Sequence, residues 1–149
     1  MLELFNKLIH NQTFLTIISG VLVYVLGQLI LEFIIKPKVE YRKLIQKIAY
    51  TITMYACYYS NPYDLNQIDN NKKQDYSEVS KQIRNLGAEI AGYIGTLPII
   101  SIKRKKLNNI LNALIGISNG LFKSSENDNP IRDNRKFKNE IERILRIKK

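Results

Sequence analysis

The longest apolar stretch of the chain lies near its N-terminus. No residue from Asn11 to Leu31 is charged, and these 21 residues would form a helix of about 31 Å, the thickness of a bilayer's hydrocarbon core. A cleaved signal peptide is the main alternative, but it needs a small-residue cleavage site, and the first alanine is Ala49. A buried core helix is disfavoured by the length of the uncharged run. The pattern predicts a short extracytoplasmic N-terminus over 1–12 and a transmembrane helix over 13–35.

Small and polar residues gather on one side of this predicted helix. At 100° per residue six of them share an arc of about 120°, and Leu22, Val25 and Leu26 lie opposite. Small residues let helices approach closely, and Gln or Thr can form hydrogen bonds across the contact. We interpret this arc as a surface for self-association, which could enclose a water-filled lumen; the alternative is chance clustering in a polar-tolerant anchor. The predicted surface comprises Thr13, Thr16, Gly20, Tyr24, Gly27, Gln28 and then Glu32.

Helical periodicity continues beyond Pro37, which fits the first turn of a new helix. Apolar residues recur at helical spacing from Tyr41 to Tyr59, and Ser60-Asn61-Pro62 ends that helix. Residues 61–74 are polar and predict a loop. A second helix follows, with an unbroken seam of apolar residues spaced three and four apart. The seam comprises Tyr76, Val79, Ile83, Leu86, Ile90, Tyr93 and Leu97.

Two more helices complete the pattern. The third runs from about Lys103 to Lys123, and the last begins at Pro130 with Asn129 as its cap. The predicted inner face of the third helix is Leu107, Ile110, Leu111, Leu114, Ile115, Ser118, Leu121 and Phe122. That of the last helix is Phe137, Ile141, Ile144 and Leu145. No extended strand pattern is present, so we predict an all-α protein in which one transmembrane helix precedes an antiparallel four-helix bundle over 36–149.

The charge distribution predicts how the span is oriented. The 149 residues carry a net charge of +10, but only Lys7 is basic before the span. The basic residues that closely follow the span are Lys36, Lys38, Arg42, Lys43 and Lys47. The positive-inside rule therefore places residues 36–149 in the cytoplasm and the N-terminus outside. Glu32 lies four residues before Lys36, a spacing that suits an ion pair.

A second group of basic residues lies in the C-terminal third and needs another explanation. RNA, anionic lipid, an acidic protein partner and simple solvation are all open interpretations. The predicted basic binding face comprises Lys103, Arg104, Lys105, Lys106, Arg132, Arg135, Lys136 and Lys138. No RNA-binding signature accompanies these residues.

Catalytic motifs are missing from the sequence. No phosphate-binding loop or dinucleotide motif occurs, and the single histidine, His10, is predicted to lie across the membrane from the bundle. The single cysteine, Cys57, excludes a multi-cysteine metal site, and its apolar surroundings predict a core thiol. Glu140 and Glu142 lie two apart on a helix and face different directions. We therefore expect no enzymatic activity, no metal and no cofactor.

Six of the nine tyrosines fall between Tyr41 and Tyr63. One interpretation is an aromatic surface that stacks bases or docks a partner. The other, which we favour for Tyr41, Tyr55 and Tyr59, is that the rings belong to the core. The roles of Tyr50, Tyr58 and Tyr63 stay open at this point.

Two resemblances add to this interpretation. The stretch from Lys36-Pro37 through Tyr59-Ser60-Asn61-Pro62, followed by Leu114-Ile115-Gly116-Ile117-Ser118-Asn119, is similar to a group of small bacterial membrane proteins of unassigned role. The layout of one span and a helical bundle resembles the HEPN-like membrane accessory proteins of type VI-B CRISPR systems. That resemblance implies a ring-shaped pore that serves anti-phage defence. HEPN ribonucleases use an arginine that is followed closely by a histidine. No arginine of this chain is followed by a histidine, so the resemblance implies a protein without nuclease activity.

Together these patterns predict a bacterial inner-membrane protein that assembles with copies of itself. We expect a pore-forming or membrane-perturbing effector or accessory in defence, whose partners are the bilayer, its own copies and an RNA or RNA-guided effector protein. The alternative is a membrane-tethered adaptor that binds RNA or a protein through the basic face, without a pore. Gene neighbourhood and the mass of the solubilised complex would separate these hypotheses.

Overall fold

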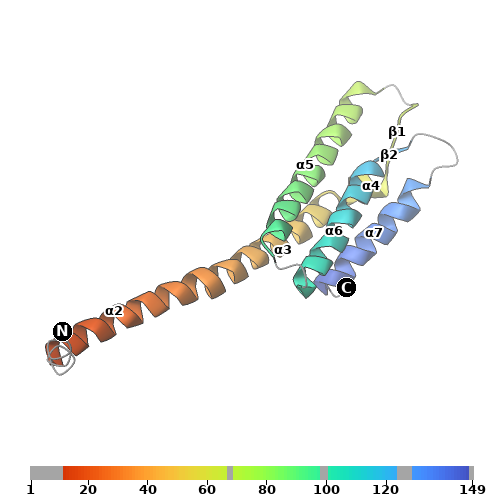
Figure 1. Cartoon of the computed structure of the whole chain (residues 1–149). Helices are drawn as coiled ribbons and strands as arrows, with labels where there is room; N and C mark the ends of the chain where they lie inside the picture. Colours follow the sequence, from red (N-terminus) through yellow and green to blue (C-terminus); the bar gives the residue numbers. More distant parts are fainter. Residues whose placement is uncertain (1–11, 67–68, 98–100, 124–128, 148–149) are drawn as a thin grey trace. The chain divides into compact units, whose positions relative to one another are not determined.

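The computed structural model describes residues 12–66, 69–97, 101–123 and 129–147 (Figure 1). The protein is 86% helical, with one long apolar helix near the N-terminus and several packed helices. The prediction of a mostly helical protein is therefore confirmed. The chain divides into two compact units, Met1–Lys43 (unit 1) and Leu44–Lys149 (unit 2). The predicted N-terminal segment over 1–12, with Lys7 and His10, lies almost wholly outside the described residues.

Unit 1 carries the apolar segment. It contains α2 (Gln12–Ile30), the π-helical turn η1 (Leu31–Ile35) and the first part of α3 (Lys36–Met54). No residue of α2 is buried, and the apolar window has a mean hydropathy of 2.3. The segment is long and apolar enough to cross a membrane. A signal sequence passes the same test, whereas the core helix of a soluble protein would be mostly buried.

The π-helical turn has a cause in the sequence. Pro37 lies in the first turn of α3, as predicted. A proline inside helical backbone has no N–H to donate, and its ring clashes with the carbonyl four residues earlier, which here belongs to Phe33. Just before the proline, the Lys36 N–H donates to the carbonyl of Leu31, five residues back. This wider turn gives the ring the room that a regular α-helix would deny it.

Unit 2 contains the hydrophobic core. Besides the rest of α3, it holds α4 (Ala56–Ser60), α5 (Asn70–Gly95), α6 (Ile102–Asn119) and α7 (Pro130–Leu145). Helix α6 packs against both α5 and α7, and α4 also packs against α7 (Figure 1). The most deeply buried apolar side chains are Ile48, Ile90, Leu107, Ile110, Leu114, Ile117, Leu121 and Ile141.

The predicted seam of α5 is confirmed in its centre. Val79, Ile83, Leu86 and Ile90 are buried, and the remaining seam residues are partly buried. The predicted inner face of α6 is wrong at Ile115, which is 43% exposed. Ala113 and Ile117 are buried on α6 instead, because this helix contacts neighbours on two sides, α5 and α7.

The helix predicted over Tyr41 to Ser60 is interrupted. Tyr55 has φ −97° and ψ 19°, outside the α-helical region, so α3 ends at Met54 and α4 begins at Ala56. This break changes which side of α4 faces the core. Tyr59 is buried, whereas Cys57 is exposed. The prediction of a core thiol is therefore wrong.

Two helix starts show how caps set the boundaries. Asp69 caps α5, because its Oδ1 accepts a hydrogen bond of 3.1 Å from the Lys72 N–H. The helix therefore begins inside 61–74, where a loop was predicted. Asn129 caps α7 in the same way, with 3.2 Å from the Arg132 N–H to its Oδ1, and this cap was predicted correctly.

A small parallel strand pair was not predicted. Strand β1 (Tyr63–Asp64) pairs with β2 (Phe122–Lys123), and the Tyr63 N–H donates to the Leu121 carbonyl at 2.9 Å. The third helix was expected to reach Lys123, but α6 ends at Asn119. Leu121 and Phe122 thus reach the interior from beyond the helix. Two residues per strand are too few to show an alternating pattern in sequence.

Candidate functional site

The predicted self-association arc lies on regular helix. Six of its members, Thr13 through Gln28, fall within α2 and are exposed. A Cβ added at Gly20 or Gly27 would meet no atom within 4 Å, so nothing in the described part of the chain covers the glycine side of α2. The 100° projection therefore holds from Thr13 to Gln28. Glu32 lies in η1, where each residue advances by a smaller angle, so it cannot be placed by that projection.

The polar members of the arc differ in how they are satisfied. The Thr16 hydroxyl donates to the Gln12 carbonyl at 2.9 Å, a bond inside its own helix. Neighbouring Ser19 does the same to the Thr16 carbonyl. The Gln28 amide has no hydrogen-bond partner among the described residues. Gln28 is therefore the arc residue that most needs a partner from outside the chain.

The predicted ion pair between Glu32 and Lys36 is confirmed. The Lys36 ammonium donates to the Glu32 carboxylate. Both side chains are more than half exposed, so the pair contributes little to stability in water.

The predicted basic face divides between two helices. Lys103 to Lys106 occupy the first turns of α6, and the other four members lie on α7. A Cβ on Gly116 would meet the Phe137 ring, and a Cβ on Gly120 would meet Asn134, so late α6 lies beside the first half of α7. The two basic groups therefore lie toward opposite ends of unit 2, and the structure does not gather all eight residues on one face.

Arg104 has a structural contact that the sequence did not reveal. Its Nη1 donates to the carbonyls of Leu97 at 2.9 Å and Ile94 at 3.4 Å. Ile94 lies in the last turn of α5 and Leu97 lies two residues beyond its end, where backbone carbonyls lack the acceptor role they have inside a helix. The guanidinium thereby caps α5 and complements the negative end of its dipole. Arg104 holds two helices together, and we remove it from the binding face.

Three basic residues of α7 have acidic partners on their own helix. Lys138 Nζ lies 3.0 Å from Glu142 Oε1, with both side chains less than a quarter exposed. Asp133 lies 3.6 Å from Lys136 and 3.7 Å from Arg132. Glu142 therefore serves as an ion-pair partner. Arg135 has no acidic partner among the described residues, and with Lys138 it lines a hollow of about 410 Å³ between α4 and α7.

A buried polar network joins α5 to α6. The Ser80 and Ser118 hydroxyl oxygens are 2.8 Å apart, and Arg84 Nε donates to Ser118 Oγ at 3.1 Å. Arg84 also donates to Asn119 Oδ1 at 3.0 Å. Ser118 is 1% exposed, so these bonds fix the register between the two helices. Sequence patterning placed Ser118 inside but gave no signal for its partners.

Asn134 is another buried polar residue that the sequence did not mark. Its Nδ2 donates to the carbonyls of Tyr59 at 2.9 Å and Gly120 at 2.7 Å. One side chain on α7 thus donates hydrogen bonds to backbone carbonyls at the ends of both α4 and α6. Its Oδ1 is buried without a hydrogen-bond partner. An asparagine in a polar helix of this composition gives no advance sign of burial.

The tyrosines form a structural cluster at one end of unit 2. The rings of Tyr58 and Tyr76 meet edge to face with centroids 4.9 Å apart, and Tyr63 lies 5.7 Å from Tyr76. The hydroxyls bond within the chain: Tyr59 to the Ile52 carbonyl at 2.8 Å and Tyr76 to the Asn61 carbonyl. Burial raises the pKa of Tyr59 and of Tyr76 above 10.0. A base-stacking role fits these rings poorly, and Tyr50, at 64%, is the only largely exposed tyrosine of unit 2 among the described residues.

Comparison with known proteins adds no assignment. Neither a family model, nor a curated protein, nor a solved structure matches this chain. The functional interpretation therefore rests on the residues described above.

Proposed function

We propose that the protein is anchored in a membrane by the segment Gln12–Ile35 and associates with copies of itself through one side of α2. The observation that carries this proposal is the Gln28 amide, which has no partner among the described residues. In hydrocarbon an amide without a hydrogen bond costs several kcal/mol, about 4–8 in the least polar reference solvent. A second copy of the helix can supply that bond.

The rest of the arc supports a close helix contact. Gly20 and Gly27 expose bare backbone on the side that carries Gln28, and Tyr24 is 67% exposed there. Thr16 contributes less, since its proton is already donated within the helix. The proposed contact surface is therefore centred on Gly20, Tyr24, Gly27 and Gln28.

Orientation and biological role follow from the flanking charges and from the resemblance to type VI-B accessory proteins. We propose that unit 2 lies in the cytoplasm of a bacterium and that the assembly forms a pore, or perturbs the inner membrane, in anti-phage defence. The protein would act without catalysis.

We also propose that unit 2 is an antiparallel four-helix bundle. Three contacts between α5 and α6 support it, because the partner number falls as the other rises: Ser80 with Ser118, Gly87 with Leu111, and Leu97 with Arg104. The contacts of Gly116 with Phe137 and of Gly120 with Asn134 support the same relation for α6 and α7.

The second candidate function is a membrane-tethered adaptor without a pore. Lys105, Lys106 and Arg135 are exposed and have no acidic partner among the described residues. Their separation along unit 2 favours two small contacts over one broad RNA-binding face. Charge reversal at Lys105 and Lys106 would abolish the activity of an adaptor and leave membrane conductance unchanged.

The experiment measures the mass of the full chain in detergent. We expect an oligomer for the natural chain. Replacing Gly20 and Gly27 with Leu should shift it toward monomer, because leucine side chains hold the backbones apart, and Gln28→Leu should weaken it by removing the shared hydrogen bond.

The matched control adds bulk to the opposite side of the same helix. Val25→Phe with Leu29→Phe should leave the mass unchanged. Self-association through this surface would be overturned if the natural chain is monomeric, or if the mass of the oligomer is unchanged when both glycines are replaced. Equal loss of mass in the control would show that the contact does not lie on the glycine side.

A further inference from the structure

One end of unit 2 combines exposed isoleucines with exposed cations. Ile102 is 75% exposed and Ile147 is 42% exposed. Both lie next to exposed basic residues, at the start of α6 and just beyond α7. We call this group the basic end; it comprises Ile102, Lys103, Lys105, Lys106, Arg146 and Ile147.

Contacts within unit 2 place these two segments about one helical turn apart along the axes of α6 and α7. Going from Gly120 to Gly116 on α6 moves the contact on α7 from Asn134 to Phe137. Continued residue for residue along both helices, this relation places Leu145, the last residue of α7, level with positions 108–109 of α6, about one helical turn from Lys105 and Lys106. Figure 1 shows the start of α6 and the end of α7 at the same end of unit 2.

Local backbone chemistry does not explain the positions of Lys105, Lys106 and Arg146. The first turn of α6 has no acidic residue. The N-terminal end of a helix is the positive end of its dipole, so lysines there weaken the helix. Arg104 is compensated by the carbonyls of α5, but Lys105 and Lys106 lie on the other side of the turn and are exposed. Arg146 has φ 57°, a left-handed conformation that favours glycine.

The chain that joins the two units limits how far this end can lie from the apolar segment. Lys47 pairs with Glu89 and Tyr55 bonds to Gln82, so Leu44 lies beside the last turns of α5, close to the basic end. Eight residues, 36–43, connect Ile35 to Leu44. Nine steps along a chain reach at most about 30 Å, whatever the arrangement of the two units.

We propose that the basic end docks on the anionic lipid headgroups of the membrane that holds α2. This inference rests on the proposed membrane anchoring. Lysine and arginine would pair with lipid phosphates, and Ile102 and Ile147 would enter the boundary between headgroups and acyl chains. Lipid fits better than RNA, because single-stranded RNA is held by aromatic stacking, and the basic end has isoleucines instead.

The test uses the full chain in nanodiscs and follows amide hydrogen exchange. The first amides of α6 lack helical acceptors and should exchange quickly in water. Discs of phosphatidylcholine mixed with phosphatidylglycerol should slow exchange over residues 102–107 about tenfold relative to discs of phosphatidylcholine alone. Lys105→Glu with Lys106→Glu should remove this lipid dependence.

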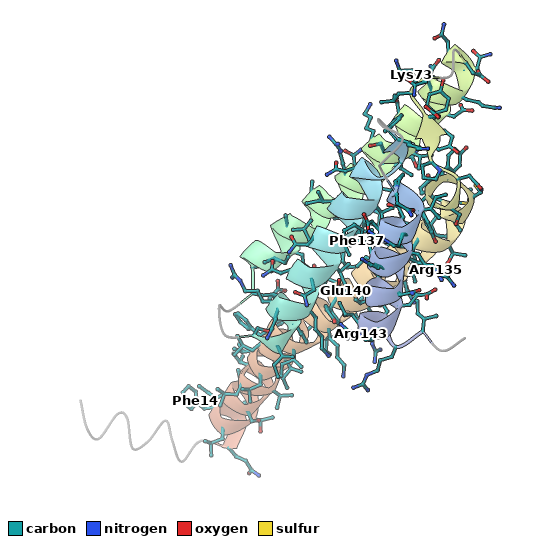
Figure 2. All side chains as sticks on the ribbon, turned by 90° about the vertical axis from the view of Figure 1, so that its right-hand side faces the viewer. Phe14, Lys73, Arg135, Phe137, Glu140 and Arg143 are labelled. Atoms are coloured by element: carbon teal, nitrogen blue, oxygen red, sulfur yellow. The ribbon has the colours of Figure 1, made fainter. Side chains whose placement is uncertain are left out.

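A matched control reverses the same charge elsewhere. Lys72→Glu with Lys73→Glu changes the start of α5, and Lys73 lies at the end of unit 2 opposite Arg143 (Figure 2). This control should keep the lipid dependence. Arg146→Gly should weaken the lipid dependence by about fivefold without lowering the melting temperature, because glycine accepts φ 57° at least as well as arginine.

The outcomes separate docking from anchoring. Resistance to carbonate extraction is scored in the same samples. A chain that is extracted overturns the proposed anchoring and the docking with it. A chain that stays inserted but shows no difference between the two lipids overturns the docking alone. Equal loss of lipid dependence in the Lys72/Lys73 control, or protection by RNA in phosphatidylcholine discs instead of by phosphatidylglycerol, also overturns it.

Discussion

Glycines in α2 and in α6 occupy opposite situations. A Cβ at Gly116 would lie 2.4 Å from the Phe137 ring, and one at Gly120 would lie 2.2 Å from Asn134 Oδ1. A Cβ at Gly20 or Gly27 would meet nothing within 4 Å. Both helices therefore carry small residues on one side, but only α6 finds the neighbour for that side within its own chain. The difference is that α7 covers the glycine side of α6, whereas nothing in the described part of the chain covers the glycine side of α2.

The largest expected effect comes from adding one methyl group at Gly120, where α7 lies closest. Gly120→Ala should lower the free energy of unfolding by about 2–4 kcal/mol, because the new Cβ would displace Asn134 from two backbone carbonyls. Chemical denaturation of the solubilised chain, followed by circular dichroism, measures the loss.

Two other glycines serve as controls for that measurement. Gly92 is an exposed residue of α5, and a Cβ there would meet nothing within 4 Å. Gly92→Ala should therefore raise the free energy of unfolding by up to about 1 kcal/mol, because alanine favours the helix more than glycine does. Gly20→Ala should leave the unfolding of unit 2 unchanged. Similar losses for Gly120→Ala and Gly92→Ala would contradict the close contact of α6 with α7.

A smaller effect separates two adjacent cations. Arg104→Gln should cost about 1–2 kcal/mol, because the end of α5 loses a charged donor to two carbonyls. Lys105→Gln should leave stability unchanged or raise it by about 0.3–1 kcal/mol, since it removes a positive charge from the positive end of the α6 dipole. Thermal unfolding of both variants gives the comparison, and equal effects would mean that Arg104 is not a cap.

The smallest effect concerns the tyrosines at high pH. Burial raises the folded-state pKa of Tyr59 and Tyr76 above 10.0, so both rings are neutral in the folded protein over a pH range where the unfolded chain is already ionised. Their contribution is fully present below pH 10 and is lost as pH rises through the folded-state pKa. Denaturation midpoints should therefore fall above pH 10, and Tyr76→Phe should make that fall shallower. A steeper fall in the variant would contradict the direction of the shift.

Helical periodicity predicted where the helices lie better than it predicted which residues of different elements contact one another. The apolar segment, the centre of the α5 seam and the Asn129 cap follow from residue type and spacing, which act over one or two helical turns. The break at Tyr55 and the pairing of β1 with β2 were not predictable in this way. They depend on contacts between residues far apart in sequence, such as Tyr63 with Leu121.

The candidate site shows the same division. The sequence predicted the two basic groups from their charge and the arc on α2 from its helical projection. It could not reveal that Arg104 reaches back to Leu97, or that Lys138 is held by Glu142. The sequence does not distinguish a solvated charged side chain from one that forms hydrogen bonds or ion pairs. Only the packing of the helices shows which basic residues have partners within the chain and which are exposed to bind something else.

The exposed position of Cys57 makes the sidedness of the protein measurable with ordinary chemistry. It is the single cysteine of the chain, and the break at Tyr55 leaves it on the surface of unit 2. A maleimide that cannot cross lipid would label intact cells only where unit 2 faces outward. The residue that contributes nothing to the core thus supplies a natural reporter of topology, with no substitution needed.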